Sequence, residues 1–153
     1  MTKCALYARV SSDRQAKEGD SIPAQLDALR KYARENRFDV VGEFVDDGIS
    51  GTKDKRDELQ KLLDAVRADR VDLICFTRLD RWFRSIRHYV NTQALLDAHH
   101  VDWVAIWESV YDTTTPAGRL IVNQMMSIAQ FEAENTGQRI RQVQAYKVKQ
   151  REV

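Results

Sequence analysis

The stretch that decides the fold runs from residue 3 to residue 12 and reads Lys3-Cys4-Ala5-Leu6-Tyr7-Ala8-Arg9-Val10-Ser11-Ser12. It is apolar, contains no proline and therefore predicts a buried β-strand, with even-numbered and odd-numbered side chains on opposite faces. An arginine on such a strand needs an anion, because an unpaired interior charge is costly. The strand either holds a salt-bridged Arg9 before a turn-forming serine pair, or it delivers Ser11 to an anionic ligand.

Length and composition indicate one globular domain. The chain has 153 residues, of which 43% are hydrophobic and 31% charged, enough for a core of its own. It contains no run of about 18 apolar residues and no leader that resembles a signal peptide. We therefore expect no membrane span and a cytoplasmic location. The only cysteines, Cys4 and Cys75, lie in predicted strands, where a thiol acts as a small hydrophobe.

The net charge of +1 conceals two basic clusters. One lies in residues 137–151, which include five Lys or Arg and no acid, and a solvated helix face would explain it. The other is interleaved with Leu79, Trp82 and Phe83, which makes a solvated face a less natural explanation. Its members are Arg78, Arg81, Arg84 and Arg87.

Strands and helices alternate along the sequence. Three further strands are predicted at residues 40–45, 71–77 and 101–107, and helices at Pro23–Asn36, from Asp57 as cap to about Arg70, from Ser85 as cap to about His99, and from Ala117 onward. This alternation predicts an α/β fold with a mainly parallel sheet and right-handed crossovers. The strand order is not fixed by the pattern.

The last predicted helix is too long for the globule. About 33 residues at 1.5 Å each give about 50 Å, against about 40 Å for a compact domain of this size, so part of the helix must project. Ile121, Met125 and Ile128 form an apolar face on its first half that suits a partner subunit. Beyond Gly137 the helix turns basic and suits phosphates.

The unusual residues follow successive strands. Ser11 follows the first strand, Asp46 and Asp47 the second, and Arg78–Arg84 the third. Because ligands bind beyond the carboxyl ends of parallel strands, these groups should meet at one edge. A serine among arginines indicates a phosphate site.

Other serine chemistries fit the sequence poorly. The three histidines lie within or at the end of one predicted helix, and motifs for α/β-hydrolases, P-loops and zinc sites are missing from the sequence. Attack on a phosphodiester remains, with guanidinium groups stabilising the charge that develops.

Four motifs in order resemble the catalytic domain of the serine site-specific recombinases, the resolvase/invertase family, from Tyr7 to about Arg141. In this sequence they read Tyr7-x-Arg9-Val10-Ser11 with Gln15; Asp46-x-Gly48-x-Ser50-Gly51 with Arg56; Leu79-Asp80-Arg81-x-x-Arg84; and Gly118-Arg119-Leu120 with Ala129-Gln130-Phe131-Glu132. The loop motif and Glu18–Ile22 look most like the large serine recombinases. One position departs from the pattern, since Ala133 stands where relatives usually carry arginine.

The resemblance implies a resolvase-like fold in which Ser11 attacks DNA and forms a covalent 5′-phosphoserine, with no metal and no cofactor. It implies that Arg9, Arg81 and Arg84 line the phosphate, that Asp80 orients arginines and that Arg56 arrives with a mobile loop. The remaining carried-over site residues are Tyr7, Gln15 and an acid from Asp46 or Asp47.

The resemblance also implies partners and a division of the chain. Residues 1–115 would be the catalytic part, residues 116–153 a long oligomerisation and DNA-contacting helix, and a C-terminal DNA-binding region would be absent. Double-stranded DNA and further copies of the chain are the expected partners, as a dimer and as a tetramer in the active synapse. The expected DNA-contacting residues are Glu132, Arg139, Arg141, Lys147, Lys149 and Arg151.

Two other functions remain open at this point. A metal-dependent nuclease could hold magnesium with Asp46, Asp47 and Asp80, because clustered carboxylates near strand ends bind such metals. A DNA-binding or oligomerisation module without activity could keep the same fold.

Overall fold

The computed structural model describes residues 1–10, 21–47, 56–82 and 85–151, with the backbone alone for 148–151. These residues form a four-stranded parallel sheet of order β2-β1-β3-β4. The strands are β1 (Lys3–Arg9), β2 (Asp39–Asp46), β3 (Leu73–Phe76) and β4 (Asp102–Ala105). The helices are α1 (Ile22–Glu35), α2 (Asp57–Arg67), α3 (Leu79–Trp82), α4 (Ile86–Ala98) and α5 (Pro116–Arg151). The predicted α/β class with a parallel sheet is confirmed.

Alternation along β1 divides the core into two layers. Cys4 and Leu6 pack with Leu29 of α1 on one face of the sheet. Ala5 and Tyr7 pack on the opposite face, in a cluster that includes residues of α2, α3, α4 and α5. The alternation predicted for the first strand is therefore present, and both faces of β1 are buried. This position in the middle of the sheet explains the continuous apolar run.

The two cysteines lie in the core, as predicted. Cys4 and Cys75 are fully buried on neighbouring strands, with their sulfur atoms 3.4 Å apart. The contact with Cys4, together with burial, raises the pKa of the Cys75 thiol. That thiol therefore stays protonated at neutral pH and packs as an apolar group.

Three helices end at residues in the left-handed region without a glycine. These residues are Arg37, Asp69 and His100, each with φ of 57° or 58°, and they follow α1, α2 and α4. After α1, the Phe38 amide donates to the Ala33 carbonyl at 2.9 Å, which closes the last turn in the Schellman manner. The usual glycine signal for a helix end is thus missing from the sequence.

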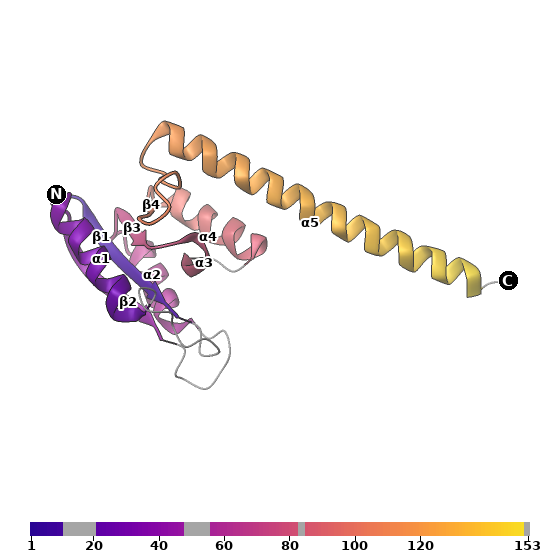
Figure 1. Ribbon diagram of the computed structural model, residues 1–153, viewed down its shortest axis with the longest axis horizontal. Coiled ribbons are helices and arrows are strands. Elements are labelled where there is room, and N and C mark those ends of the chain that lie inside the picture. The colour runs from indigo at the N-terminus through magenta and orange to yellow at the C-terminus, as the bar shows by residue number, and fades with distance from the viewer. Residues whose placement is uncertain (11–20, 48–55, 83–84, 152–153) are drawn as a thin grey trace.

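Helix α5 leaves the body of the molecule as one straight rod (Figure 1). Its 36 residues correspond to about 54 Å, so the predicted projection is confirmed. Its buried hydrophobic side chains are Val122 and Met126, with Met125 at the margin of the core. The predicted face is split, because Ile121 and Ile128 are exposed. Within the described ranges, no helix has the length and apolarity needed to cross a bilayer.

The two glycines of α5 occupy contrasting environments. A Cβ at Gly118 would lie 1.9 Å from the Asp112 carbonyl oxygen, whereas one at Gly137 would meet nothing within 4 Å. The Gly118 amide, near the start of the helix, also donates a hydrogen bond to Thr115 Oγ1 at 3.0 Å. The loop before α5 can therefore press against the helix only because residue 118 lacks a side chain.

We predict opposite effects of alanine at these glycines. Gly118→Ala should lower the free energy of unfolding by about 1–3 kcal/mol, since the loop backbone must move. Gly137→Ala should raise it by up to about 1 kcal/mol, because alanine favours helix. Urea unfolding of both variants measures the difference. Equal changes in the two would contradict the close approach at Gly118.

Candidate functional site

The carboxyl ends of the three strands β2, β1 and β3 meet at one edge of the sheet. Arg9 is the last residue of β1 and pairs in register with Asp46, the last residue of β2. The Val10 amide extends this pairing by donating to the Asp46 carbonyl at 3.1 Å. The turn after β3 enters α3, which carries Asp80 and Arg81. Of the residues predicted to meet at this edge, Asp46, Asp80 and Arg81 are described and lie there, whereas Ser11 and Arg84 lie outside the described residues.

Arg56 lies at the centre of this edge and is buried, with 8% of its surface exposed. Its Nε donates to the Tyr7 hydroxyl at 3.0 Å, and its Nη2 donates to the carbonyl oxygens of Arg81 and Trp82 at 3.0 and 2.6 Å. Its guanidinium also lies over the Tyr7 ring, 5.3 Å from the centroid. The resemblance implied that Arg56 travels with a surface loop, whereas here the residue is fixed in the interior.

Asp46 holds the start of α2 from a neighbouring strand. Its carboxylate accepts from the Glu58 amide at 3.0 Å, the Leu59 amide at 3.1 Å and the Tyr7 hydroxyl at 2.7 Å. The prediction that Asp57 caps this helix is wrong, because Asp57 is its first helical residue and the N-cap position makes no side-chain cap bond. A carboxylate beside orphan amides stabilises a helix start wherever it comes from in the sequence.

Tyr7 connects Asp46 with Arg56 and remains a phenol. Burial is the main cause that raises the pKa of Tyr7 far above its ordinary value, Asp46 adds to the rise, and Arg56 opposes it. The hydroxyl therefore donates to Asp46 at neutral pH and accepts from Arg56. Its place in the site is structural, because its proton is held by Asp46 and its oxygen accepts from Arg56.

Arg9 brings a second guanidinium to the same edge. Its Nη2 donates to the backbone carbonyl of Asp80 at 2.5 Å. Burial, followed by the positive charge of Arg56, lowers the pKa of Arg9, although an arginine stays charged at any physiological pH. Arg81 is the third cation, 10% exposed, with its Nε 4.0 Å from an Asp80 carboxylate oxygen. Three like charges packed this closely favour an anion.

Two buried nitrogens of the cluster reinforce that preference. Arg9 Nε and Arg56 Nη1 are inaccessible to solvent and, among the residues that the structure describes, find no hydrogen-bond acceptor. Such donors are costly when left unmet. Phosphate oxygens are the acceptors that arginine binds best. The site therefore has the electrostatics of a phosphate-binding centre.

Gln25 is a site residue that the sequence analysis did not single out. It is fully buried, donates from Nε2 to the Arg9 carbonyl at 3.0 Å and accepts from the Arg9 amide at 3.3 Å. It thus fixes the last peptide of β1, two residues before Ser11. The available signal was its spacing, because Gln25, Leu29 and Ala33 recur every four residues on the buried face of α1.

Several predicted residues lie elsewhere. Ser11, Gln15 and Arg84 fall outside the described residues. Asp47 follows β2 and is exposed. The predicted DNA contacts Glu132, Arg139, Arg141 and Lys147 are exposed on the projecting part of α5, and the side chains of Lys149 and Arg151 fall outside the description. The described part of the chain contains no group of three or more carboxylate, imidazole or thiol side chains arranged for a metal ion.

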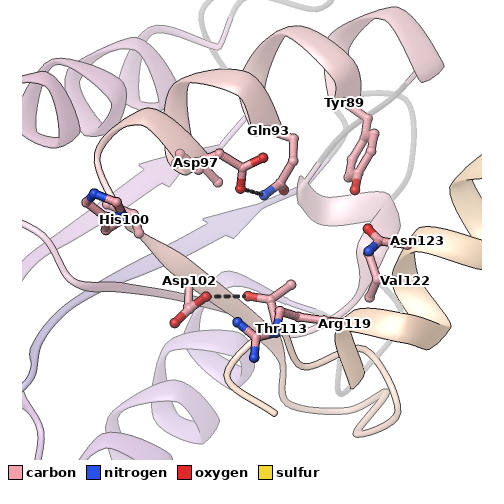
Figure 2. Close-up of a pocket in the computed structure, with 11 residues that line it drawn as sticks. Tyr89, Gln93, Asp97, His100, Asp102, Thr113, Arg119, Val122 and Asn123 are labelled. Atoms are coloured by element: carbon pink, nitrogen blue, oxygen red, sulfur yellow. Dashed lines mark hydrogen bonds between the residues drawn. The ribbon is translucent and has the colours of Figure 1, made fainter. Parts of the chain in front are cut away.

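A separate pocket lies away from this edge. It is formed between α4, the first residues of β4 and the start of α5 (Figure 2), and its lining includes Tyr89, Asp97 and Arg119. Two of its polar groups already have partners, since Gln93 donates to Asp97 at 2.8 Å. The strands are parallel, so the pocket lies at the end of the sheet opposite to the arginine cluster.

Comparisons with known proteins agree on one family. The family model for the N-terminal domain of resolvases matches residues 4–153. The transposon Tn917 resolvase of Enterococcus faecalis is 29% identical over 128 residues, 84% of this chain and 61% of that protein. The chain thus spans less than two thirds of that relative.

Solved structures extend the similarity to the fold. The N-terminal catalytic domain of TP901-1 integrase is 33% identical with a TM-score of 0.74, over 88% of this chain and 99% of that one. A resolvase family site-specific recombinase from Streptococcus pneumoniae is 25% identical with a TM-score of 0.80, over 99% of both chains.

Substitution of Asp46 tests the arrangement of the site. Asp46→Ala should lower the free energy of unfolding by about 2–3 kcal/mol, because two helix amides and a buried hydroxyl lose their acceptor. The control is Asp47→Ala, which removes the next carboxylate, an exposed one, and should change stability by less than about 0.5 kcal/mol. Chemical denaturation of both variants is the measurement. An unchanged free energy of unfolding in Asp46→Ala would show that α2 does not depend on this carboxylate.

Proposed function

The chain belongs to the family of resolvase N-terminal domains, and from that premise we propose that it cuts and rejoins double-stranded DNA in site-specific recombination, with Ser11 as the nucleophile. The observation that carries the proposal is the cluster of Arg9, Arg56 and Arg81 at the carboxyl end of β1. Ser11 follows Arg9, the last residue of β1, by two positions in the sequence.

The proposed reaction exchanges one phosphoester for another. The Ser11 oxygen forms a bond to phosphorus while the bond from phosphorus to the 3′ oxygen breaks. The serine proton leaves, and the departing 3′ oxygen gains a proton to become a hydroxyl. The product is a 5′-phosphoserine, which conserves the ester so that a 3′-hydroxyl of another strand can displace the serine by the reverse step.

The arginines supply the stabilisation that this reaction needs. Negative charge spreads over the equatorial phosphate oxygens in the transition state, and preorganised donors in a dry site are the most effective way to stabilise it. We assign direct contact with the phosphate to Arg9 and Arg81, whereas Arg56 holds the carbonyl oxygens at the end of α3. We include Arg84 and Gln15 as further contacts on the strength of the family motif, with Asp80 as the group that orients Arg81.

The proposed partners are double-stranded DNA and further copies of the chain. Leu120, Ile128 and Phe131 are exposed along α5 by 58%, 60% and 67%, and a second copy would cover such a row. The basic end of α5 would contact phosphates of the DNA backbone. Such contacts position a protein on DNA without distinguishing base sequences. Recombination of two duplexes cuts four strands. With one serine in each subunit, that count requires a tetramer.

We predict that Ser11→Ala abolishes the covalent adduct and leaves stability within about 0.5 kcal/mol of the parent, because it removes a single hydroxyl. The protein as its gene encodes it is incubated with a pool of duplexes of random sequence. Adducts are then detected on denaturing gels, and thermal melting monitors the fold. Ser12→Ala is the matched control and should retain the adduct.

The same assay in EDTA addresses the nuclease alternative. Adduct formation should survive chelation, because guanidinium groups rather than a divalent cation stabilise the transition state. Cleavage that needs magnesium and leaves no protein on the DNA would point to a nuclease. DNA binding without cleavage in either condition would point to a module without activity.

A further inference from the structure

Helix α3 carries Arg81 and cannot be stable by itself. It has four residues, Leu79–Trp82, whereas isolated helices shorter than about 12 residues are marginal in water because nucleation is unfavourable. The position of Arg81 therefore depends on contacts that other segments make with this single turn.

Opposite charges hold the two ends of α3. At its start, the Leu79 amide donates to a carboxylate oxygen of Glu108 at 2.7 Å. At its end, Arg56 donates to the carbonyl oxygens of Arg81 and Trp82. An anion at the amino end and a cation at the carboxyl end match the partial charges of a helical turn. Glu108 is separated from Leu79 by 29 positions in the chain.

The loop that bears Glu108 also contacts the two residues immediately before this turn. The Trp107 amide donates to the Thr77 carbonyl at 3.0 Å. The Arg78 guanidinium lies over the Trp107 ring, 5.5 Å from its centroid. Glu108 is itself fixed within a turn, because the Tyr111 amide donates to the Glu108 carbonyl at 2.8 Å. The carboxylate therefore comes from a segment with a defined conformation.

The other end of this loop is joined to α5. Asp112 forms an isolated antiparallel β-bridge with Val104 of β4. Its carbonyl oxygen lies 1.9 Å from the position that a Cβ on Gly118 would take. A displacement of the first turn of α5 must therefore press on residue 112, four positions after Glu108. The loop connects the projecting helix with the turn that carries Arg81.

We propose that Glu108 is a positioning residue for DNA cleavage, which holds α3 so that Arg81 faces the phosphate and transmits the position of α5 to that turn. The inference rests on the function proposed above. Glu108 acts through the Leu79 amide and not on the substrate. It should therefore change the rate of the chemical step without changing the affinity for DNA.

The test compares Glu108→Ala with Glu108→Gln, which keeps an acceptor oxygen for the Leu79 amide. Amide hydrogen exchange is followed at residues 79–82 in the protein without DNA. Adduct formation is followed in a single turnover at saturating DNA, on one duplex chosen from those that the parent protein captured from the random pool. Val110→Ala changes an exposed residue of the same loop and serves as the control.

In Glu108→Ala, exchange at residues 79–82 should accelerate about tenfold and the adduct rate should fall about 100-fold, the effect of a small misplacement of a catalytic group. DNA affinity should stay within about twofold, because the missing carboxylate touches no phosphate. Glu108→Gln should recover most of both losses, and Val110→Ala should match the parent.

Two results would overturn the inference. Unchanged exchange at residues 79–82 in Glu108→Ala would show that Glu108 does not hold α3, whatever happens on DNA. Accelerated exchange with an unchanged adduct rate would show that α3 does not position the chemistry. A parent protein that forms no adduct on any duplex would instead remove the proposed function, and the exchange data would still report the contact. If Glu108→Ala does not fold, Glu108→Asp replaces it, because its shorter side chain withdraws the carboxylate from the Leu79 amide, and the same faster exchange and slower adduct formation are expected.

Discussion

The burial of one cation, Arg56, organises this molecule. Moving a guanidinium out of water is costly unless its donors find oxygens. Here Nε and Nη2 donate to three oxygens from two separate segments, the Tyr7 hydroxyl and the carbonyls of Arg81 and Trp82. Through these bonds Arg56 ties β1 to α3, and through Tyr7 it is linked to Asp46 and the start of α2. The fold and the site thus share a single polar network.

The same network leaves positive charge without full compensation. Arg9 lies close enough to Arg56 for the second cation to lower its pKa, and buried nitrogens of both lack acceptors among the described residues. Closely packed cations with unmet donors destabilise the free protein. The same donors are already oriented to stabilise the negative charge of a transition state when an anion binds. In the proposed function, a phosphate of DNA would supply acceptors that the described residues do not.

The features of the fold that depend on the periodicity of apolar residues can be predicted from the sequence. The alternation in β1, the parallel α/β arrangement, the projecting helix and the meeting of Asp46 with Asp80 and Arg81 at one edge all follow from residue spacing and from the rule for strand ends. Contacts between distant segments do not follow from spacing. Asp46 replaces Asp57 as the group that caps α2, and Gln25 and Glu108 fix their neighbours from other elements. Each is a polar residue whose partner is 12 to 29 positions away, and local pattern carries no information about such pairs.

Whether Ser11 is the nucleophile is decided by identifying the residue that becomes bonded to DNA. Adducts formed by the complete gene product are digested with protease and nuclease, and tandem mass spectrometry identifies the modified residue. We expect a nucleotide joined through its 5′ phosphate to Ser11, two positions after the last residue of β1 in the sequence. A nucleotide attached to Ser12 or to a tyrosine, or one joined through a 3′ phosphate, would contradict it.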